Sequence, residues 1–291
     1  MTPLPALDVT RLPTPRGEPV EVRWLGTAGF ALEHQGHVVL IDPYLTRASL
    51  ARCVLAPLRP DLATLARLVP RADAIVVGHT HFDHVLDVPA LARLTGARVF
   101  GSRSAVALCH LEGVAADRVT CVEPGPGERP TEVEVGPFRL RFAPSVHSRM
   151  LLGRVAFPGD IADCDAVVPL RAERYRCGAV FSVEIEVAGR RLLHVGSADL
   201  VEQGLGARDV DLLLLCVAGW TSTPRLVERV AGALAPRAVL LSHWDDFFVP
   251  LDRPVRALPA MRGAELASRL DDALRGAAPV GVVAPLGKVA L

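Results

Sequence analysis

Short apolar runs alternate with stretches of helical apolar spacing from about residue 20 to the C-terminus. Three β-branched and apolar runs, residues 20–26, 29–35 and 37–44, are separated by glycine-containing turns and predict a β-meander. Helical spacing after an aspartate predicts helices over 61–69 and 87–96, the second ending at Gly96. Between these helices, the apolar run at 73–77 predicts a short buried strand.

The rest of the chain repeats this order of strands followed by strand and helix units. Strands are expected at 97–101, 119–123, 132–135, 138–142, 211–219, 237–244 and 280–286, and a hairpin at 178–199. Helices are expected at 104–113, 223–234 and 263–276. We therefore predict an α/β protein in which two sheets pack face to face with helices outside. The two halves would be related by a pseudo-twofold axis, and the mostly apolar strands suit burial on both faces.

The boundaries of the folded part follow from composition. Residues 1–19 are proline-rich and aperiodic, which predicts an arm lying on or off the domain. Residues 20–291 are predicted to form a single domain. Within it, residues 148–177 mix proline, glycine and arginine without periodicity and predict an irregular or mobile flap.

Charge and hydropathy narrow the classes of partner. The chain has 32 basic and 32 acidic residues, so no broad field attracts nucleic acid or an anionic membrane. No apolar run reaches the roughly 18 residues of a membrane span, and the N-terminus lacks the pattern of a signal peptide. We expect a cytoplasmic protein that acts on a small-molecule substrate, and the sequence leaves the oligomeric state open.

The stretch VVGHTHFDHVLDVPAL, residues 76–91, gathers histidine and aspartate directly after an apolar run. In an extended segment His79 and His81 point the same way, so one cation can touch both. Asp83 and His84 follow where the next helix begins, and they can face a second point nearby. Two adjacent metals fit this spacing, and imidazole and carboxylate without thiolate suit zinc, iron or manganese. The alternative is a solvated histidine-rich loop without a ligand.

HTHFDH resembles the H-x-H-x-D-H motif of the metallo-β-lactamase superfamily, whose members form a four-layer αββα sandwich with a dinuclear metal site. Four further positions resemble that family's remaining motifs in chain order: Asp42 in LIDPYL, His147 in APSVHS, Asp199 in HVGSADL and His243 in LLSHWDDF. The family usually has Gly-Asp directly in the fourth motif, whereas here two residues separate Gly196 from Asp199.

The resemblance implies a role for each matched residue. His79, His81 and His147 would hold the first metal. Asp83, His84 and His243 would hold the second metal, and Asp199 would bridge the two. Asp42 would orient the metal loop without binding metal. Two zinc ions are expected, with iron or manganese as alternatives.

The expected chemistry is hydrolysis by a metal-bound hydroxide, which Asp83 would orient and whose proton it would shuttle. The motifs WLGTAGF, LIDPYL, HTHFDH and LSHWDDFF look most like the branch containing ascorbate-phosphate lactonases and N-acyl-phosphatidylethanolamine phospholipase D-like enzymes. That likeness implies an ester, lactone or phosphodiester bond. The alternatives are a flavo-diiron-type oxidoreductase and a non-catalytic binding member of the fold.

Candidate substrate contacts lie beside the metal motifs. Arg149 follows His147 by two residues and would reach an anionic group, unless it is an ordinary surface arginine. Trp244 and Phe247, with Phe248, flank His243, and Tyr44 follows Asp42. These rings would form an apolar wall of the site or, alternatively, pack in the core. Met150, Leu151 and Leu152 would give the flap an apolar underside.

Overall fold

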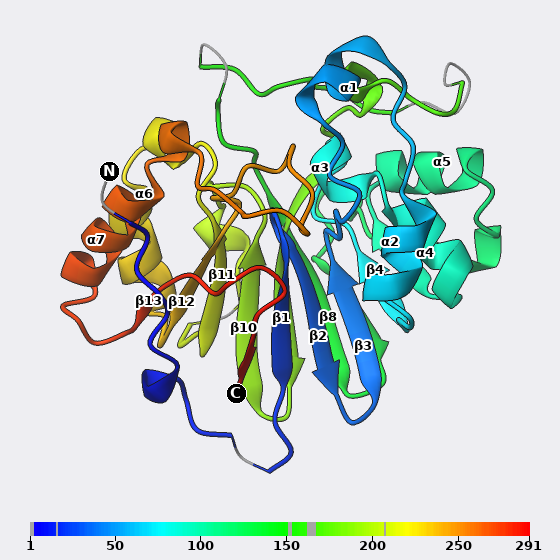
Figure 1. Ribbon diagram of the computed structural model, residues 1–291. Coiled ribbons are helices and arrows are strands. Elements are labelled where there is room, and N and C mark those ends of the chain that lie inside the picture. The colour runs from blue at the N-terminus through cyan, green and yellow to red at the C-terminus, as the bar shows by residue number, and fades with distance from the viewer. Residues whose placement is uncertain (1–2, 16, 151–152, 162–166, 207) are drawn as a thin grey trace.

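Two β-sheets lie face to face in the computed structural model and carry helices on their outer sides (Figure 1). The structure describes residues 3–15, 17–150, 153–161, 167–206 and 208–291. Within these ranges each sheet has seven strands. This arrangement is the four-layer αββα sandwich that the sequence predicts.

The first sheet begins with the predicted meander. Its strands are, in spatial order, β14 (Lys288–Ala290), β1 (Glu21–Gly26), β2 (Gly29–His34), β3 (His37–Ile41), β4 (Ala74–Val76), β5 (Arg98–Gly101) and β6 (Val119–Cys121). Strands β1 to β3 pair antiparallel, whereas β3 to β6 pair in parallel. Helical connections join the parallel strands, as parallel pairing requires.

The second sheet repeats this order of antiparallel and then parallel strands. Its strands are β13 (Val280–Gly281), β12 (Val239–Ser242), β11 (Leu212–Cys216), β10 (Arg190–Val195), β9 (Val180–Val187), β8 (Phe138–Ser145) and β7 (Thr131–Val135). Strands β7 to β10 are antiparallel, and β10 to β13 are parallel. The strand predicted over 280–286 is wrong beyond Gly281. The chain instead returns to the first sheet, where β14, which the sequence did not reveal, pairs with β1.

The helices lie outside the sheets. They are α1 (Leu50–Leu55), α2 (Leu62–Leu68), α3 (Phe82–Val85), α4 (Val88–Thr95), α5 (Arg103–Leu111), α6 (Leu226–Arg229) and α7 (Gly263–Ala273). Short 3-10 turns lie at Val9–Arg11, Ala116–Arg118, Ala172–Arg174, Glu202–Gly204, Trp220–Ser222 and Pro259–Met261. Helix α1 was not predicted. The helix predicted over 223–234 begins only at α6, because Arg225 is left-handed at φ +53°, and it ends as a π-helical turn over Val230–Leu234.

Two apolar clusters hold the layers together. The larger joins both sheets through buried aromatic and branched side chains, among them Trp24, Phe30 and Phe142, and reaches α6 and α7. The other joins the first sheet to its helices and includes Leu65 of α2 and Leu91 of α4. Burial of this apolar surface is the main favourable contribution to folding.

The prediction that the strands are buried on both faces holds for β11 and β12, in which every residue is buried. It is wrong for β7 and β8, whose residues alternate in burial. Their outward positions carry charge, and Arg139 pairs with Glu132 across the two strands at 2.5 Å. Charged side chains remain hydrated on this outer face, and exposed ion pairs of this kind contribute little to stability.

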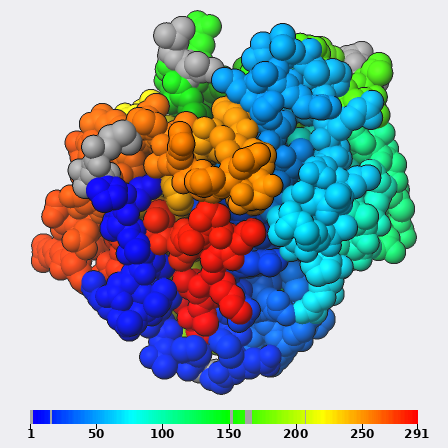
Figure 2. Space-filling view, in the orientation of Figure 1, coloured from blue at the N-terminus to red at the C-terminus, as the bar shows by residue number. Residues whose placement is uncertain are grey.

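The described part of the N-terminal arm lies on the molecule. Leu7 is buried, and its backbone N–H donates to the Val282 carbonyl at 2.9 Å. Figure 2 shows this blue segment beside the red C-terminal residues. Among the described helices, none combines the length and the apolar character that crossing a bilayer requires.

Candidate metal centre

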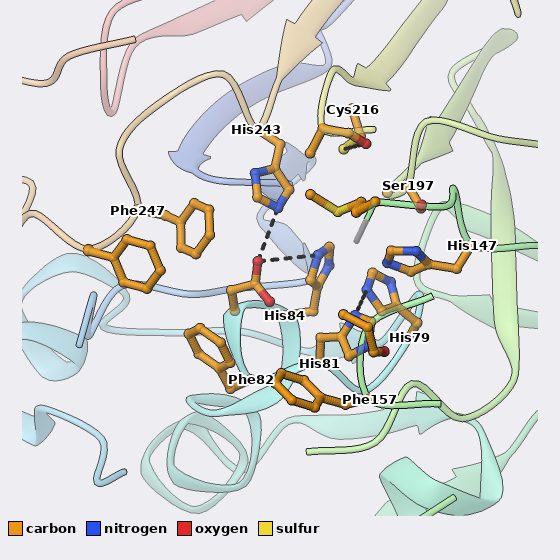
Figure 3. A pocket seen from close by; sticks show the side chains of 16 residues that line it. His79, His81, Phe82, His84, His147, Phe157, Ser197, Cys216, His243 and Phe247 are labelled. Atoms are coloured by element: carbon orange, nitrogen blue, oxygen red, sulfur yellow. Dashed lines mark hydrogen bonds and ion pairs between the residues drawn. The ribbon is translucent and has the colours of Figure 1, made fainter. Parts of the chain in front are cut away.

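Loops that follow three different strands meet at one end of the sandwich, the top of Figure 1. His79 and His84 follow β4, His147 follows β8, and His243 follows β12. Their side chains converge on one cavity, where Figure 3 shows the imidazole rings turned toward one another. Residues far apart in the sequence are thereby brought into contact: Asp83 and His243, 160 positions apart, lie 3.0 Å from each other at Oδ2 and Nε2.

The converging side chains form three overlapping groups of possible metal ligands. They are His79 with His81 and His147, Asp83 with His84 and His243, and Asp42 with His79 and His84. Within each group the donor atoms lie within 4.8 Å of one another. The first two groups are the two ligand sets that the resemblance implies, and the structure therefore brings six of the seven expected ligands together.

Hydrogen bonds fix which nitrogen is free in two of the three rings of the first group. His81 donates from Nε2 to the Ala156 carbonyl, and His147 donates from Nδ1 to the Ser148 carbonyl, both at 2.7 Å. A carbonyl only accepts, so these nitrogens carry the protons and the other nitrogen of each ring keeps its lone pair. Nδ1 of His81 then faces Nε2 of His79 at 3.1 Å, a separation that a proton or a cation must stabilise.

The second group is oriented by carboxylates. His243 Nε2 lies 3.0 Å from Asp83 Oδ2, and His84 Nε2 lies 4.0 Å from the same oxygen. His84 donates from Nδ1 to Asp42 Oδ2 at 2.9 Å, so in the neutral ring Nε2 keeps its lone pair toward Asp83. A carboxylate behind a histidine in this way fixes the ring and raises its basicity as a ligand.

Asp42 fits behind His84 only because glycine lies on either side. It accepts the Gly78 N–H at 2.6 Å, and its own backbone is left-handed at φ +44°. A Cβ at Gly78 would lie 2.8 Å from Asp42 Oδ2, and one at Gly196 would lie 2.7 Å from it. The structure thus places Asp42 where it orients the metal loop through Gly78 and His84.

Burial sets the charge of the first group. It lowers the pKa of His79 and of His81, and it lowers the pKa of His147 to about 4. Burial also lowers the pKa of His84, but Asp42 outweighs it and leaves that pKa raised. For Asp83, burial acts to raise the pKa, yet the His243 hydrogen bond and the neighbouring imidazoles hold it below its usual range. Neutral imidazole and ionised carboxylate are the forms that bind metal.

The residues present fit a pair of divalent cations. His79 Nδ1 and His243 Nδ1 are buried without a hydrogen-bond partner in the described part of the chain, an arrangement that is unfavourable unless another interaction compensates. Nitrogen and carboxylate donors in the absence of a thiolate suit zinc, iron or manganese. Cys216 also lines the cavity, where burial raises the pKa of its thiol, but it belongs to none of the ligand groups found among the described residues.

The lowered histidine pKa values predict how the metal-free protein responds to acid. Between about pH 6.5 and 4 the histidines of the unfolded chain bind protons that His79, His81 and His147 of the folded chain do not. The free energy of unfolding therefore decreases as the pH is lowered. The lowered pKa of His194 acts in the same direction, whereas the raised pKa values of His84 and Asp87 act in the opposite direction. Four lowered values against two raised values are expected to leave a net loss. We expect a loss on the order of 1–3 kcal/mol, measured as the free energy of unfolding in urea at each pH.

Two variants sharpen this measurement. His147→Gln removes one of the titrating rings and should flatten the pH dependence, whereas His110→Ala on the exposed side of α5 should leave it unchanged. Equal or greater stability of the metal-free protein at pH 4.5 than at pH 7 would show that the three rings are not held neutral.

The structure does not bring Asp199 to the cluster. Its Oδ1 accepts from Arg229 at 3.0 Å and from the Leu200 N–H at 2.9 Å, and it is absent from the described residues that line the cavity. The two extra residues after Gly196 are the reason, because they carry the carboxylate past the end of β10. Ser197 takes the place beside the cavity, where it accepts the Ser148 N–H at 2.9 Å and so fixes the loop that carries His147.

The cavity has a volume of about 240 Å³ and one apolar side. Phe247, predicted as a substrate contact, lines it together with Phe82 and Phe248. Trp244 does not reach it, because its ring stacks on Trp24 with centroids 4.9 Å apart.

Two further expected contacts also lie elsewhere. Tyr44 is buried, its hydroxyl accepts the Ala48 N–H at 2.7 Å, and it is not among the described residues that line the cavity. Arg149 is exposed and is likewise not among the described lining residues. Both therefore match the alternative interpretation of the sequence, a core residue and a surface residue.

The segment predicted as a flap, 148–177, borders the cavity. Met150, Ala156 and Phe157 line it, and the Thr80 N–H ties the metal loop to the Cys177 carbonyl at 2.9 Å. Leu151 and Leu152, expected on the underside, lie outside the described residues. The motion of this segment as a lid stays a prediction.

Several of the described residues that line the cavity were missed from the sequence, among them Phe82, Ser197 and Phe157. Phe82 stands inside HTHFDH, and its place between two ligands was the available signal. Ser197 was signalled by the altered spacing in GSADL. Phe157 gave no signal, because nothing in an aperiodic segment shows which side chain will turn inward.

Comparison with known proteins agrees with this site. A family model described as the beta-lactamase superfamily domain matches residues 37–244. A protein of Anaeromyxobacter sp. (strain K), described as a UPF0173 metal-dependent hydrolase, is 29% identical over 276 residues, which cover 91% of this chain and 84% of that protein. A UPF0173 metal-dependent hydrolase of Caldivirga maquilingensis is 29% identical over 230 residues, covering 78% and 82%.

Solved structures share the fold at low sequence identity. Igni18, a metallo hydrolase from Ignicoccus hospitalis, is 18% identical with a TM-score of 0.54, covering 94% of this chain and 98% of that one. CmlA, a diiron β-hydroxylase from Streptomyces venezuelae, is 16% identical with a TM-score of 0.59, covering 96% of this chain and 55% of that one. One sandwich thus carries both hydrolytic and oxidative chemistry, and function must be argued from the site.

Proposed function

The chain belongs to the β-lactamase superfamily and is a metal-dependent hydrolase, and on that premise we propose that it binds two zinc ions and cleaves an ester, lactone or phosphodiester bond. One observation carries the proposal: two groups of three ligands, each within 4.8 Å, share a single cavity. His79, His81 and His147 would hold one ion, and Asp83, His84 and His243 the other.

Zinc in such a site supplies a water whose pKa is lowered towards neutrality, together with a positive charge for a developing oxyanion. The side chains of this chain would orient that water and accept its proton. Asp83 is already held on one side, where Oδ2 accepts from His243. In the described part of the chain Oδ1 has no donor, so it is free to accept a hydrogen bond from the attacking water and to take its proton.

The absence of a bridging carboxylate from Asp199 changes the role that we propose for Asp83. With Ser197 after Gly196, the two ligand groups share no carboxylate from β10. Asp83, which contacts both His84 and His243, is the acidic side chain that lines the cavity among the described residues. We propose that Asp83 therefore serves both as ligand and as the acceptor of the water proton.

The proposed function is tested by a hydrolysis screen of the zinc-loaded protein against aryl esters, lactones, thioesters and phosphodiesters. Turnover of at least one class should disappear with chelator and return with zinc. Turnover that survives complete removal of metal would reject the proposal. Isolation with two irons and visible absorption would instead favour an oxidoreductase, the alternative that the diiron neighbour illustrates.

A further inference from the structure

The cavity beside the metal ligands is apolar apart from the ligands and Ser197. Phe82, Phe247 and Phe248 form what we call the aromatic wall, with ring centroids 4.4 Å apart for Phe247 and Phe248 and 6.4 Å for Phe82 and Phe247. Figure 3 shows Phe82 and Phe247 on the same side of the ligands, with Phe157 below them. A substrate bound at the ligands would therefore have hydrocarbon beside it.

No lysine or arginine is among the described residues that line this cavity. The buried Arg47 is committed elsewhere, to Asp245 and to the carbonyls of Asp246 and Val249. Sites that recognise phosphate or carboxylate groups usually supply an arginine fork or a lysine. Apart from the cations that the ligands would hold and the Ser197 hydroxyl, the described lining offers no group complementary to a phosphodiester.

Size limits the substrate further. A volume of about 240 Å³ is below the roughly 300–1,000 Å³ of sites for drug-sized ligands. Met150 and Phe157 also line the cavity, and their exposed fractions of 43% and 38% place apolar surface at its opening. A short acyl or aryl group fits inside, and a longer chain would extend along these two side chains.

We infer that the substrate is an uncharged carboxylic ester or lactone whose apolar group packs on the aromatic wall. The inference rests on the proposed function and narrows its three bond types. One water is consumed: its oxygen bonds to the carbonyl carbon, the ester C–O bond breaks, and its protons end on the alcohol oxygen and in solvent as the carboxylate forms. No oxidant or other co-reactant is needed.

Two measurements on the zinc-loaded full chain test this inference. The first compares kcat/KM for p-nitrophenyl acetate, butyrate and octanoate with that for bis(p-nitrophenyl) phosphate. The second measures by calorimetry the binding of acetohydroxamate, butyrohydroxamate and octanohydroxamate, which needs no turnover. Both kcat/KM and affinity should rise by up to about fourfold per methylene until the cavity is filled, and the phosphodiester should be at least about tenfold slower than butyrate.

Phe248→Ala and Phe247→Ala should flatten the dependence on chain length while zinc content stays that of the wild type. Phe248 is the cleaner variant, because the Phe247 ring also contacts His243 at 5.0 Å. Leu62→Ala, an exposed apolar residue on α2, is the matched control and should keep the wild-type dependence.

The outcomes separate this inference from the proposed function. Chelator-sensitive turnover that favours the phosphodiester, or hydroxamate affinity that ignores chain length, overturns the apolar ester while leaving a metal hydrolase. Hydroxamate affinity that rises with chain length in a protein without any metal-dependent turnover supports the apolar site and rejects the proposed function.

Discussion

Replacing His81 by alanine is expected to lower kcat/KM by about 1,000-fold or more. The activation of water and the stabilisation of the oxyanion by a held cation are worth several kcal/mol, and each 1.36 kcal/mol is a factor of ten. His81 takes part in the first ligand group and contacts His79 directly at 3.1 Å. Steady-state kinetics on the best substrate of the screen, together with metal content by mass spectrometry, measure the effect.

The control for this variant is His110→Ala, an exposed histidine outside every ligand group of the described residues. It should keep wild-type turnover and metal content. Asp83→Asn should lose turnover as His81→Ala does but retain more metal, because the amide still offers an oxygen while it no longer accepts a proton. Full activity in either His81→Ala or Asp83→Asn would remove the basis of the proposed chemistry.

Replacing Arg47 by methionine is expected to destabilise the fold by about 3–5 kcal/mol. Arg47 and Asp245 form an ion pair at 2.5 Å with both side chains fully buried. Asp245 also accepts the Thr27 N–H at 3.1 Å, and the Thr27 carbonyl accepts the His243 N–H at 2.7 Å. Removing the arginine leaves a buried carboxylate unpaired, and urea unfolding measures the loss.

A double-mutant cycle shows whether the pair itself is responsible. Arg47→Met with Asp245→Leu should be less destabilised than the sum of the two single variants, because no charge is then left buried alone. As an exposed control, Arg139→Met removes an ion pair on the surface and should cost less than about 1 kcal/mol. A loss below 1 kcal/mol for Arg47→Met would contradict the buried pair.

This pair also bears on the site. His243 has a left-handed backbone, φ +57°, and lies two residues before Asp245. The loop that carries His243 is therefore held at its N–H by Thr27 and, through Asp245, by Arg47. We expect Arg47→Met to weaken zinc binding at the group that contains His243, even where the fold survives.

The layered fold was predictable because its strands and helices differ in period. Runs such as LLLLC in β11 are too short and too apolar for a surface helix, and Asp61 and Gly96 mark helix ends. The short elements were not predictable. Helix α1 has exposed apolar residues and no amphipathic period, and the three residues of β14 become a strand only because β1 leaves an edge for them.

Four of the expected ligands were predictable because they lie within one short stretch of the sequence. His79, His81, Asp83 and His84 are close in sequence, so local geometry alone brings them together. Asp199 shows the limit, because a spacing change of two residues moved its carboxylate to Arg229. The pairing of Arg47 with Asp245 spans 198 positions and leaves no local pattern, so only the folded chain reveals it.

Zinc titration of the metal-free wild-type protein, with turnover followed in the same samples, shows whether the two ligand groups bind metal and whether that metal is needed for catalysis. Two zinc ions should bind per chain and turnover should appear as they bind, since the chain presents two groups of three ligands around one cavity. Binding of no zinc, or full turnover in the chelated protein before any zinc is added, would contradict this expectation.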